Sequence, residues 1–202
     1  MRLSVAILCE YPTLNGGERS MLACVERFDS AEIDVTFLAP PNGPLADELQ
    51  RRSVRHIPFD LHAASGRASR DDSVRRLGEA CRDFDVLHAN SLAMGRLTGA
   101  AVAHLPCRAT AHLRDIIKLS PAAVADLNGN SRLIAVSYAV RDFHVAQGVD
   151  PDRVAVNHNG IDVSAFQDSP GASIRQELSL PESAFVVAAI GQICLRKGQD
   201  TF

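Results

Sequence analysis

Short apolar runs alternate with segments of helical character over most of this chain. Seven runs have the length of a strand, and the first of them, residues 3–9, is almost wholly apolar, as in a strand buried on both faces of a parallel sheet. The seven runs are residues 3–9, 33–38, 54–58, 84–88, 108–112, 133–136 and 153–156. Strands that alternate with helices in this way predict an α/β fold with a doubly wound, Rossmann-like parallel sheet.

The segments between these runs carry helix signals. Ser120 and Ser137 are good N-caps, and Pro121 suits the first position of a helix. The polar stretch 62–72 predicts a mobile loop. Besides a first helix after residue 17, the predicted helices are residues 45–52, 73–82, 92–104, 121–128, 138–147 and 173–178. The helix at 92–104 is rich in small residues, so it can approach the sheet closely.

The pattern changes after Phe166 and predicts a domain boundary. We expect residues 1–167 to form the first domain, 168–183 a linker and 184–202 the start of a second domain. Residues 184–190 are apolar throughout and predict one more strand, which cannot bury itself alone. This strand could be disordered or could pack on the first domain. Residues 185–190 could also pair with a second copy in a homodimer.

Composition excludes several classes of function. The net charge of −3 and the absence of Trp give no reason to expect nucleic-acid binding. The five cysteines are scattered, as in a reduced cytoplasmic protein, and the seven histidines have no zinc-ligand spacing, so no metal is expected. No run has the length of a membrane span, and the apolar start lacks the features of a signal peptide.

Glycines and polar side chains follow several of the predicted strands. In doubly wound sheets, ligands bind beyond the carboxyl ends of the strands, near the switch in strand order. Gly16 and Gly17 precede the first helix, where backbone N–H groups and the helix dipole favour an anion, although the spacing is not that of a dinucleotide fingerprint. The candidate binding residues are Gly16, Gly17, His88, Asn90, His112, Arg114, Asn159, Gly160, Arg196 and Lys197.

Each candidate has a purely structural alternative. Histidines at strand ends donate to sugar or phosphate oxygens or transfer protons, but they also serve as hydrogen-bonded core residues. Gly16 and Gly17 also fit a plain turn, with Glu18 stabilising the start of the helix. Arg114 could pair with the neighbouring carboxylate of residue 115. The stretch 157–160 fits a strand followed by a sharp turn at positive φ, and 196–198 fits either a diphosphate site or a solvated basic turn.

Taken together and in order, these stretches resemble the retaining glycosyltransferases of family 4, which have the two-domain GT-B fold. The segments that carry the resemblance are 15–19 (NGGER), 85–89 (DVLHA), 110–112 (TAH), 136–142 (VSYAVRD), 159–162 (NGID) and 191–198 (GQICLRKG). The resemblance implies that His112 lies near the donor sugar, as the catalytic-site histidine, and that Lys197 binds the donor diphosphate. It also implies that Gly16 and Gly17 lie near the phosphates and the acceptor, and that no metal or other cofactor is needed.

The sequence departs from the family pattern at three places. Glu18 directly follows Gly17, where the family commonly has one more residue between them. Gln192 stands where the family often has an arginine that helps to bind the diphosphate. The Glu-(x)7-Glu motif of the family is expected beyond residue 202.

The expected function is therefore that of the N-terminal, acceptor-side half of a hexosyltransferase. The protein would transfer a sugar from a nucleotide sugar to a glycan, a lipid-linked molecule or a small molecule with retention of configuration, with peripheral membrane contact as one option. Residues 1–202 alone are expected to be inactive, since the missing donor domain forms the other wall of the cleft. Two alternatives are a non-catalytic Rossmann-like module that binds a sugar or phosphate, and a nucleotide-sugar epimerase of related architecture.

Overall fold

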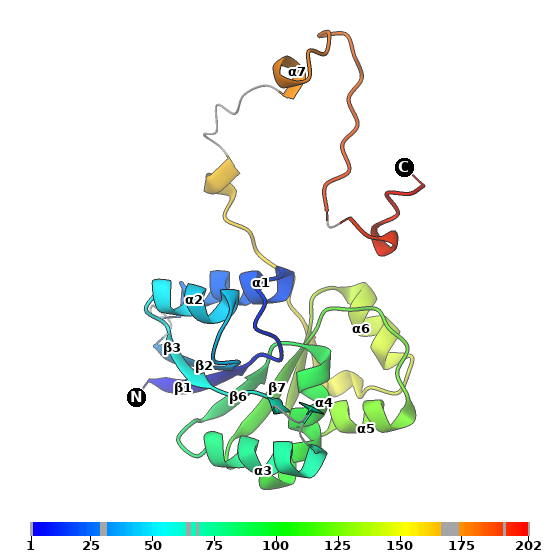
Figure 1. Cartoon of the computed structure of the whole chain (residues 1–202). Helices are drawn as coiled ribbons and strands as arrows, with labels where there is room; N and C mark the ends of the chain where they lie inside the picture. Colours follow the sequence, from blue (N-terminus) through cyan, green and yellow to red (C-terminus); the bar gives the residue numbers. More distant parts are fainter. Residues whose placement is uncertain are drawn as a thin grey trace. The chain divides into compact units, whose positions relative to one another are not determined.

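The structure is a computed structural model that describes residues 2–28, 32–63, 66–67, 69–166, 174–191 and 193–201. It separates into two units, one that ends at Ile161 and one that begins at Asp162 (Figure 1). The first unit contains the predicted sheet and its helices. Each unit is described by itself below.

The first unit is built on a seven-stranded parallel sheet, as the alternating pattern predicts. Its strands lie in the order β3-β2-β1-β6-β7-β8-β9. Their bounds are β1 Leu3–Leu8, β2 Ile33–Ala39, β3 Arg55–Pro58, β6 Val86–Ala89, β7 Arg108–Leu113, β8 Arg132–Ala135 and β9 Val154–Val156. The chain first adds strands on one side of β1 and then returns to add β6 on the other side. The switch point of the doubly wound fold therefore lies between β1 and β6.

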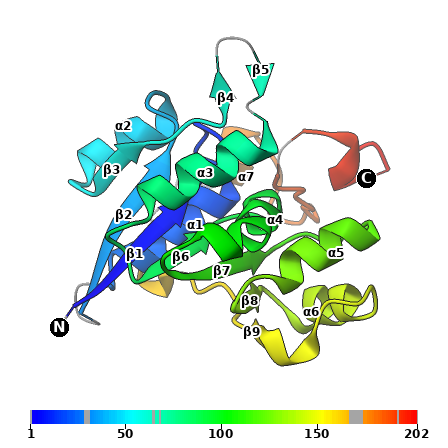
Figure 2. The ribbon, with the colours of Figure 1, turned by 90° about the horizontal axis from the view of Figure 1, so that it is seen from below.

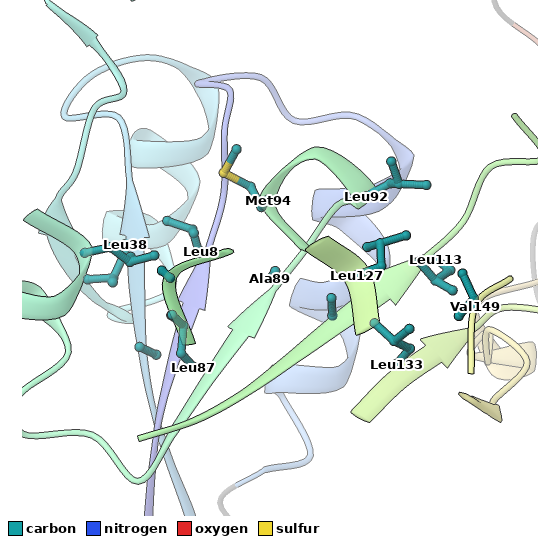
Figure 3. Close-up of a cluster of buried hydrophobic side chains, with 14 of the residues drawn as sticks. Leu8, Leu38, Leu87, Ala89, Leu92, Met94, Leu113, Leu127, Leu133 and Val149 are labelled. Carbon is teal, nitrogen blue, oxygen red and sulfur yellow. The ribbon is translucent and has the colours of Figure 1, made fainter. Parts of the chain in front are cut away.

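Helices cover both faces of this sheet (Figure 2). Two of them, α1 Gly16–Val25 and α2 Pro44–Arg51, bury Met21 and Leu49 in one core with the strands β1 and β2. The others contribute to a larger core on the opposite face, drawn in Figure 3, in which Met94 and Leu127 lie among the leucines of the strands. These helices are α3 Arg70–Ala80, α4 Leu92–Ala101, α5 Pro121–Asn128 and α6 Tyr138–Val145.

Helix α4 packs closely against its neighbours, as its small residues predict. A Cβ atom at Gly95 would lie 2.7 Å from the Cβ of Ala111 on β7, and one at Gly99 would lie 1.7 Å from the carbonyl oxygen of Asp126 on α5. Neither position has room for a side chain. The helix predicted at 92–104 is α-helical only as far as Ala101, and the 3-10 turn η2 Val102–His104 follows it.

Serine caps set where the helices begin. The side chains of Ser120 and Ser137 accept backbone N–H bonds at the starts of α5 and α6, so both predicted caps are confirmed. Ser69 does the same for Asp72 at 3.1 Å, and α3 consequently begins at Arg70, earlier than predicted. The prediction of a loop over 62–72 is wrong in part. The range contains the first residues of α3, and it also contains the short hairpin of β4 His62–Ala63 and β5 Gly66–Arg67.

The second unit contains short helical segments. They are η4 Val163–Phe166, α7 Ile174–Glu177 and η5 Leu195–Lys197. The strand predicted at 184–190 is wrong, since these residues have no regular secondary structure and Phe185 and Ile190 are 93% and 98% exposed. A strand needs a neighbour to satisfy its N–H and C=O groups, and no strand is present in the described part of this unit.

Candidate functional site

Two strands bring His88 and His112 together near the carboxyl edge of the sheet. His88 on β6 is in register with Thr110 on β7, and His112 lies two residues further along β7, on the same face. His88 Nε2 and His112 Nδ1 are 2.8 Å apart, and His88 Nδ1 lies 2.8 Å from Thr110 Oγ1. The two rings meet edge to face with their centroids 4.9 Å apart. The three side chains therefore form one hydrogen-bonded row.

The environment of this row keeps both imidazoles neutral. Burial, helped by the nearby charge of Arg114, lowers the pKa of His88 to about 4. Burial, Arg114 and His88 together lower the pKa of His112 to about 3. At neutral pH each ring is thus a hydrogen-bond donor at one nitrogen and an acceptor at the other, and neither carries a proton that it could deliver as an imidazolium acid.

Arg114 joins the ends of β6 and β7. Its Nη1 donates to the carbonyl oxygen of Asn90 at 2.5 Å, and its Nη2 donates to the side-chain oxygen of Asn90 at 2.9 Å. A Cβ atom at Gly17 would lie 3.8 Å from both Cδ and Nε of Arg114, so the start of α1 is in contact with the same side chain. Among the described residues, none of the hydrogen bonds that Arg114 makes goes to Asp115, and its buried Nε has no partner.

The start of α1 faces this cluster with its glycines. Asn15 is the N-cap, and its backbone N–H donates to the carboxylate of Glu18 at 3.0 Å. This bond agrees with the structural alternative for this stretch, in which Glu18 stabilises the start of the helix. A Cβ atom at Gly16 would have nothing within 4 Å, so the backbone there is open to a ligand. The first-turn N–H groups have no partner inside the helix, and the dipole of α1 adds positive potential next to Arg114.

The segment between β7 and α5 is held by His144 on α6 and by Gln147 in the turn that follows α6. His144 is fully buried, and its Nε2 donates to the carbonyl oxygen of Asp115 at 2.9 Å. The side chain of Gln147 accepts the N–H of Leu119 at 2.6 Å and donates to the carbonyl oxygen of Ile117 at 3.4 Å. These contacts fix the path of residues 114–120 although the segment has no regular secondary structure.

The segment after β9 returns to α1. Ser20 on α1 donates its hydroxyl to the side-chain oxygen of Asn159 at 3.1 Å. The sharp turn predicted at 157–160 is wrong, since none of these residues has a positive φ and the N–H of Asn157 continues the sheet by donating to Ala135 at 2.9 Å. A Cβ atom at Gly160 would have nothing within 4 Å. Asn159 is thus placed beside α1 by pairing of the preceding residues with β8 rather than by a turn.

The basic segment of the second unit folds back on itself. Lys197 ends η5, and Gly198 follows in the left-handed conformation with φ of 68°. A Cβ atom at Gly191 would lie 4.0 Å from Cδ of Lys197, and the side chain of Gln199 donates to the carbonyl oxygen of Gly191 at 3.5 Å. Lys197 therefore lies beside the backbone of Gly191. The side chain of Arg196 and the whole of Gln192 lie outside the described part of the chain.

Two residues of this region, Thr110 in the row and Cys9 beside Asn90, were not singled out from the sequence. Thr110 was part of a motif but had no role, although its position two residues before His112 places both on one face of the strand. Cys9 follows β1 and receives a hydrogen bond from the side chain of Asn90, with 3.7 Å between nitrogen and sulfur. Burial raises the pKa of the Cys9 thiol to about 12, so Cys9 supports Asn90 as a neutral, unreactive group.

The described residues contain neither a cluster suited to a metal ion nor a helix suited to spanning a membrane. No group of three His, Cys, Asp or Glu side chains in these ranges has an arrangement that could hold a metal ion. Likewise, no helix in the described part of the chain has the length and apolar character that crossing a membrane requires.

Comparison with known proteins identifies the family to which this arrangement belongs. Residues 14–165 match the model of Glycosyltransferase Family 4. The chain is 30% identical over 187 residues to D-inositol 3-phosphate glycosyltransferase 1 of Catenulispora acidiphila, an alignment that covers 80% of this chain and 44% of that protein. The chain therefore spans less than half of this curated relative.

Several solved structures share the fold of this chain. The structure of Anabaena HepE in complex with UDP matches with a TM-score of 0.72 and 19% identity, over 88% of this chain and 50% of that one. A glycosyltransferase from Rickettsia africae matches with a TM-score of 0.69 and 12% identity, over 90% and 51% of the two chains. A UDP-N-acetylglucosamine 2-epimerase matches with a TM-score of 0.57 and 19% identity, over 86% and 53%. The chain belongs to Glycosyltransferase Family 4, and its first unit has the fold of the N-terminal domain of GT-B glycosyltransferases.

Proposed function

We propose that this chain forms the acceptor-side half of a hexosyltransferase that transfers a sugar from a nucleotide sugar with retention of configuration. The observation that carries the proposal is the convergence of Arg114, His112 and the start of α1 at the carboxyl edge of the sheet. This edge is where doubly wound folds bind their ligands. The cluster offers positive potential and hydrogen-bond donors to the oxygens of a sugar and a diphosphate.

The donor is proposed to be a uridine diphosphate sugar. HepE of Anabaena, whose fold this chain shares, has been solved with UDP and with UDP-glucose. UDP-glucose is therefore the first donor to test. The relative from Catenulispora acidiphila is named for an inositol phosphate, which makes a phosphorylated polyol a reasonable first acceptor.

Charge on the leaving diphosphate is the main electrostatic problem of such a transfer. In the proposed mechanism the first-turn N–H groups of Gly16 and Gly17 and the guanidinium of Arg114 lower the energy of that charge without a metal ion. Lys197, which lies beside Gly191, is proposed to bind the donor diphosphate as a cation, as the resemblance to the family implies. His112 is neutral and hydrogen-bonds an oxygen of the donor sugar rather than transferring a proton.

Residues 1–202 are proposed to be inactive by themselves. A transfer needs donor and acceptor held in one geometry, and about half of the relatives' length is not represented in this chain. The identity of the acceptor, contact with a membrane, a cytoplasmic location and self-association through residues 185–190 also stay predictions.

The proposal is tested with the polypeptide encoded by the complete reading frame. Transfer of glucose by this polypeptide from UDP-glucose to a panel of polyols, polyol phosphates and glycans is followed by proton NMR, which also reports the anomeric configuration of the product. Product with the configuration of the donor supports the proposal, and an inverted product contradicts it. A His112→Ala variant is the negative control, and an Arg75→Gln variant, changed on the exposed surface of α3, is the positive control.

Two further arms separate the alternatives. Conversion of a nucleotide sugar without any acceptor would identify an epimerase. Binding of sugar phosphates with no turnover, in the complete protein, would identify a non-catalytic binding module. Transfer by residues 1–202 above the level of their own His112→Ala variant would contradict the proposed inactivity of this chain.

A further inference from the structure

Two cysteines that are far apart in the sequence meet at the amino edge of the sheet. Cys81 is the C-cap of α3 and is fully buried, whereas Cys107 directly precedes β7 and is partly exposed. Their side chains form a hydrogen bond with each other. The sequence has no CxxC spacing, so it is the fold that brings these two thiols into contact.

The backbone around the pair is held by hydrogen bonds. The carbonyl oxygen of Cys81 accepts the N–H of Phe84 at 3.3 Å, in the turn that leads from α3 to β6. The carbonyl oxygen of Asp85 accepts the N–H of Arg108 at 3.2 Å, where β7 begins. The pairing that builds the sheet therefore keeps the two thiols within reach of each other.

The two thiols differ in acidity and in access to solvent. The hydrogen bond from Cys81 holds the pKa of the Cys107 thiol below its ordinary value, although burial of Cys107 and the charge of Asp85 act against this. The same hydrogen bond, together with burial, raises the pKa of the Cys81 thiol. Cys107 is thus the thiol that ionises first, and its partial exposure lets a reagent reach it.

A groove lies where α3 meets the segment before β7. Its volume is about 630 Å³, and its lining includes Arg82 and Pro106, which are chain neighbours of the two cysteines. The lining carries charges of both signs, from Asp71, Arg75, Glu79 and Arg82. The groove therefore suits a small hydrophilic reagent that itself carries both signs of charge, as a charged peptide does.

We propose that Cys81 and Cys107 form a reversible disulfide site that closes by exchange with a small peptide disulfide of the glutathione class. In the first step the Cys107 thiolate attacks one sulfur of that disulfide, forms a mixed disulfide and releases one thiolate. In the second step the sulfur of Cys81 attacks the sulfur of Cys107 and releases the other reagent thiol. The two protein thiols lose two electrons and two protons, and one reagent disulfide becomes two thiols.

The first step prepares the second. Once Cys107 is part of a mixed disulfide, it has no negative charge that holds the proton of Cys81, and burial alone still raises the pKa of the Cys81 thiol. The sulfur of Cys81 already lies beside the sulfur that it attacks. A disulfide bond is about 2 Å long, shorter than a hydrogen bond between two thiols, so closure draws the two side chains together by rotation.

Equilibration of residues 1–202 with oxidised and reduced glutathione near neutral pH tests the proposal. Cys24→Ser and Cys194→Ser are introduced first, because these are the other cysteines that solvent reaches. Free thiols are then blocked, and mass spectrometry of the digested chain shows which cysteines are joined. We expect one linked pair of peptides, through Cys81 and Cys107, that dithiothreitol separates again. The effective concentration of the two thiols should be about 100 mM or more, well above the millimolar value of groups on a short flexible linker.

Two variants of this parent chain distinguish the roles of the two thiols. In Cys81→Ala, Cys107 should stop at the mixed disulfide with glutathione. In Cys107→Ser, the buried Cys81 should take up at least about tenfold less glutathione than Cys107 does in Cys81→Ala. Circular dichroism shows whether each variant folds, and the peptide map of the parent chain decides the matter if one of them does not.

Three results in the parent chain would overturn the proposal. They are a Cys107 that stays free, a mixed disulfide at Cys107 that accumulates while Cys81 stays free, or an effective concentration in the low millimolar range. Uptake of glutathione at Cys81 in a folded Cys107→Ser variant would contradict the order of the two steps. None of these measurements uses sugar transfer, so their outcome does not depend on the proposed function.

Discussion

The guanidinium of Arg114 holds Asn90 by two hydrogen bonds, one to its backbone carbonyl and one to its side chain. Because the two residues follow neighbouring strands, this pair fixes the ends of β6 and β7 relative to each other. It also brings a positive charge next to Gly17 at the start of α1. Stability and the proposed ligand binding therefore involve the same side chain.

Replacement of Arg114 by Gln should lower both properties. The carbonyl oxygen of Asn90 loses its charged donor, so the free energy of unfolding should fall by about 1–3 kcal/mol. Urea denaturation measures the change. The matched variant Arg75→Gln removes an exposed arginine that pairs with Asp72 and Glu79 on α3, and its midpoint should barely move. Equal effects of the two substitutions would contradict the role given to Arg114.

Acidification should destabilise the first unit through its neutral histidines. His88 and His112 have pKa values of about 4 and about 3 in the folded protein, below the ordinary value of 6.5. The unfolded chain takes up protons first, so stability is full above pH 6.5 and is lost progressively down to about pH 3. Each histidine contributes a slope of at most about 1.4 kcal/mol per pH unit.

Denaturant midpoints between pH 4 and 8 check this dependence. His112→Gln removes one of the two groups, and its stability should fall less steeply as the pH is lowered. An identical slope in the variant and the unmodified chain would show that His112 does not bind fewer protons in the folded state than in the unfolded state.

Gly16→Ala should separate ligand binding from folding. The added methyl has open space and φ of Gly16 is not positive, so the unfolding midpoint should stay the same or rise slightly. The same methyl stands where a phosphate would approach the first turn of α1, and affinity of the complete protein for UDP should fall by about tenfold. Calorimetry gives the affinity; an unaltered value would place the diphosphate elsewhere.

Gly99→Ala, in contrast to Gly16→Ala, should lower the stability of the fold. Its Cβ would lie 1.7 Å from the carbonyl oxygen of Asp126, and α4 can accept it only by moving away from α5. We expect the free energy of unfolding to fall by about 3 kcal/mol or more. Thermal unfolding followed by circular dichroism, with Gly16→Ala as the control, measures this loss, and a stable Gly99→Ala variant would mean that the two helices pack less closely than described.

The sequence predicted the parts of the fold that depend on local pattern. Buried parallel strands are recognisable as apolar runs, and Ser120 and Ser137 cap helices through bonds to their own first turns. Residues 184–190 have the same apolar character but form no strand. A strand depends on a neighbour as much as on composition, and that information is not contained in the run itself.

The sequence predicted which residues form the candidate site but not which of them contact one another. His88, Asn90, His112 and Arg114 were all expected near the carboxyl edge, and the structure joins them in two hydrogen-bonded pairs, His88 with His112 and Asn90 with Arg114. The role of Thr110 was missed because it depends on the register of β6 against β7. A shift of that register by one residue would turn Thr110 away from His88, and no pattern within either strand reports it.

The anchoring of residues 114–120 by His144 and Gln147 has a thermodynamic consequence for recognition. A flexible segment would have to be ordered whenever a ligand arrived, and that loss of entropy would weaken binding. Here folding of α6 has already ordered the segment. A ligand that binds as proposed would meet Arg114 in a prepared position, so its affinity at this edge would reflect the contacts themselves.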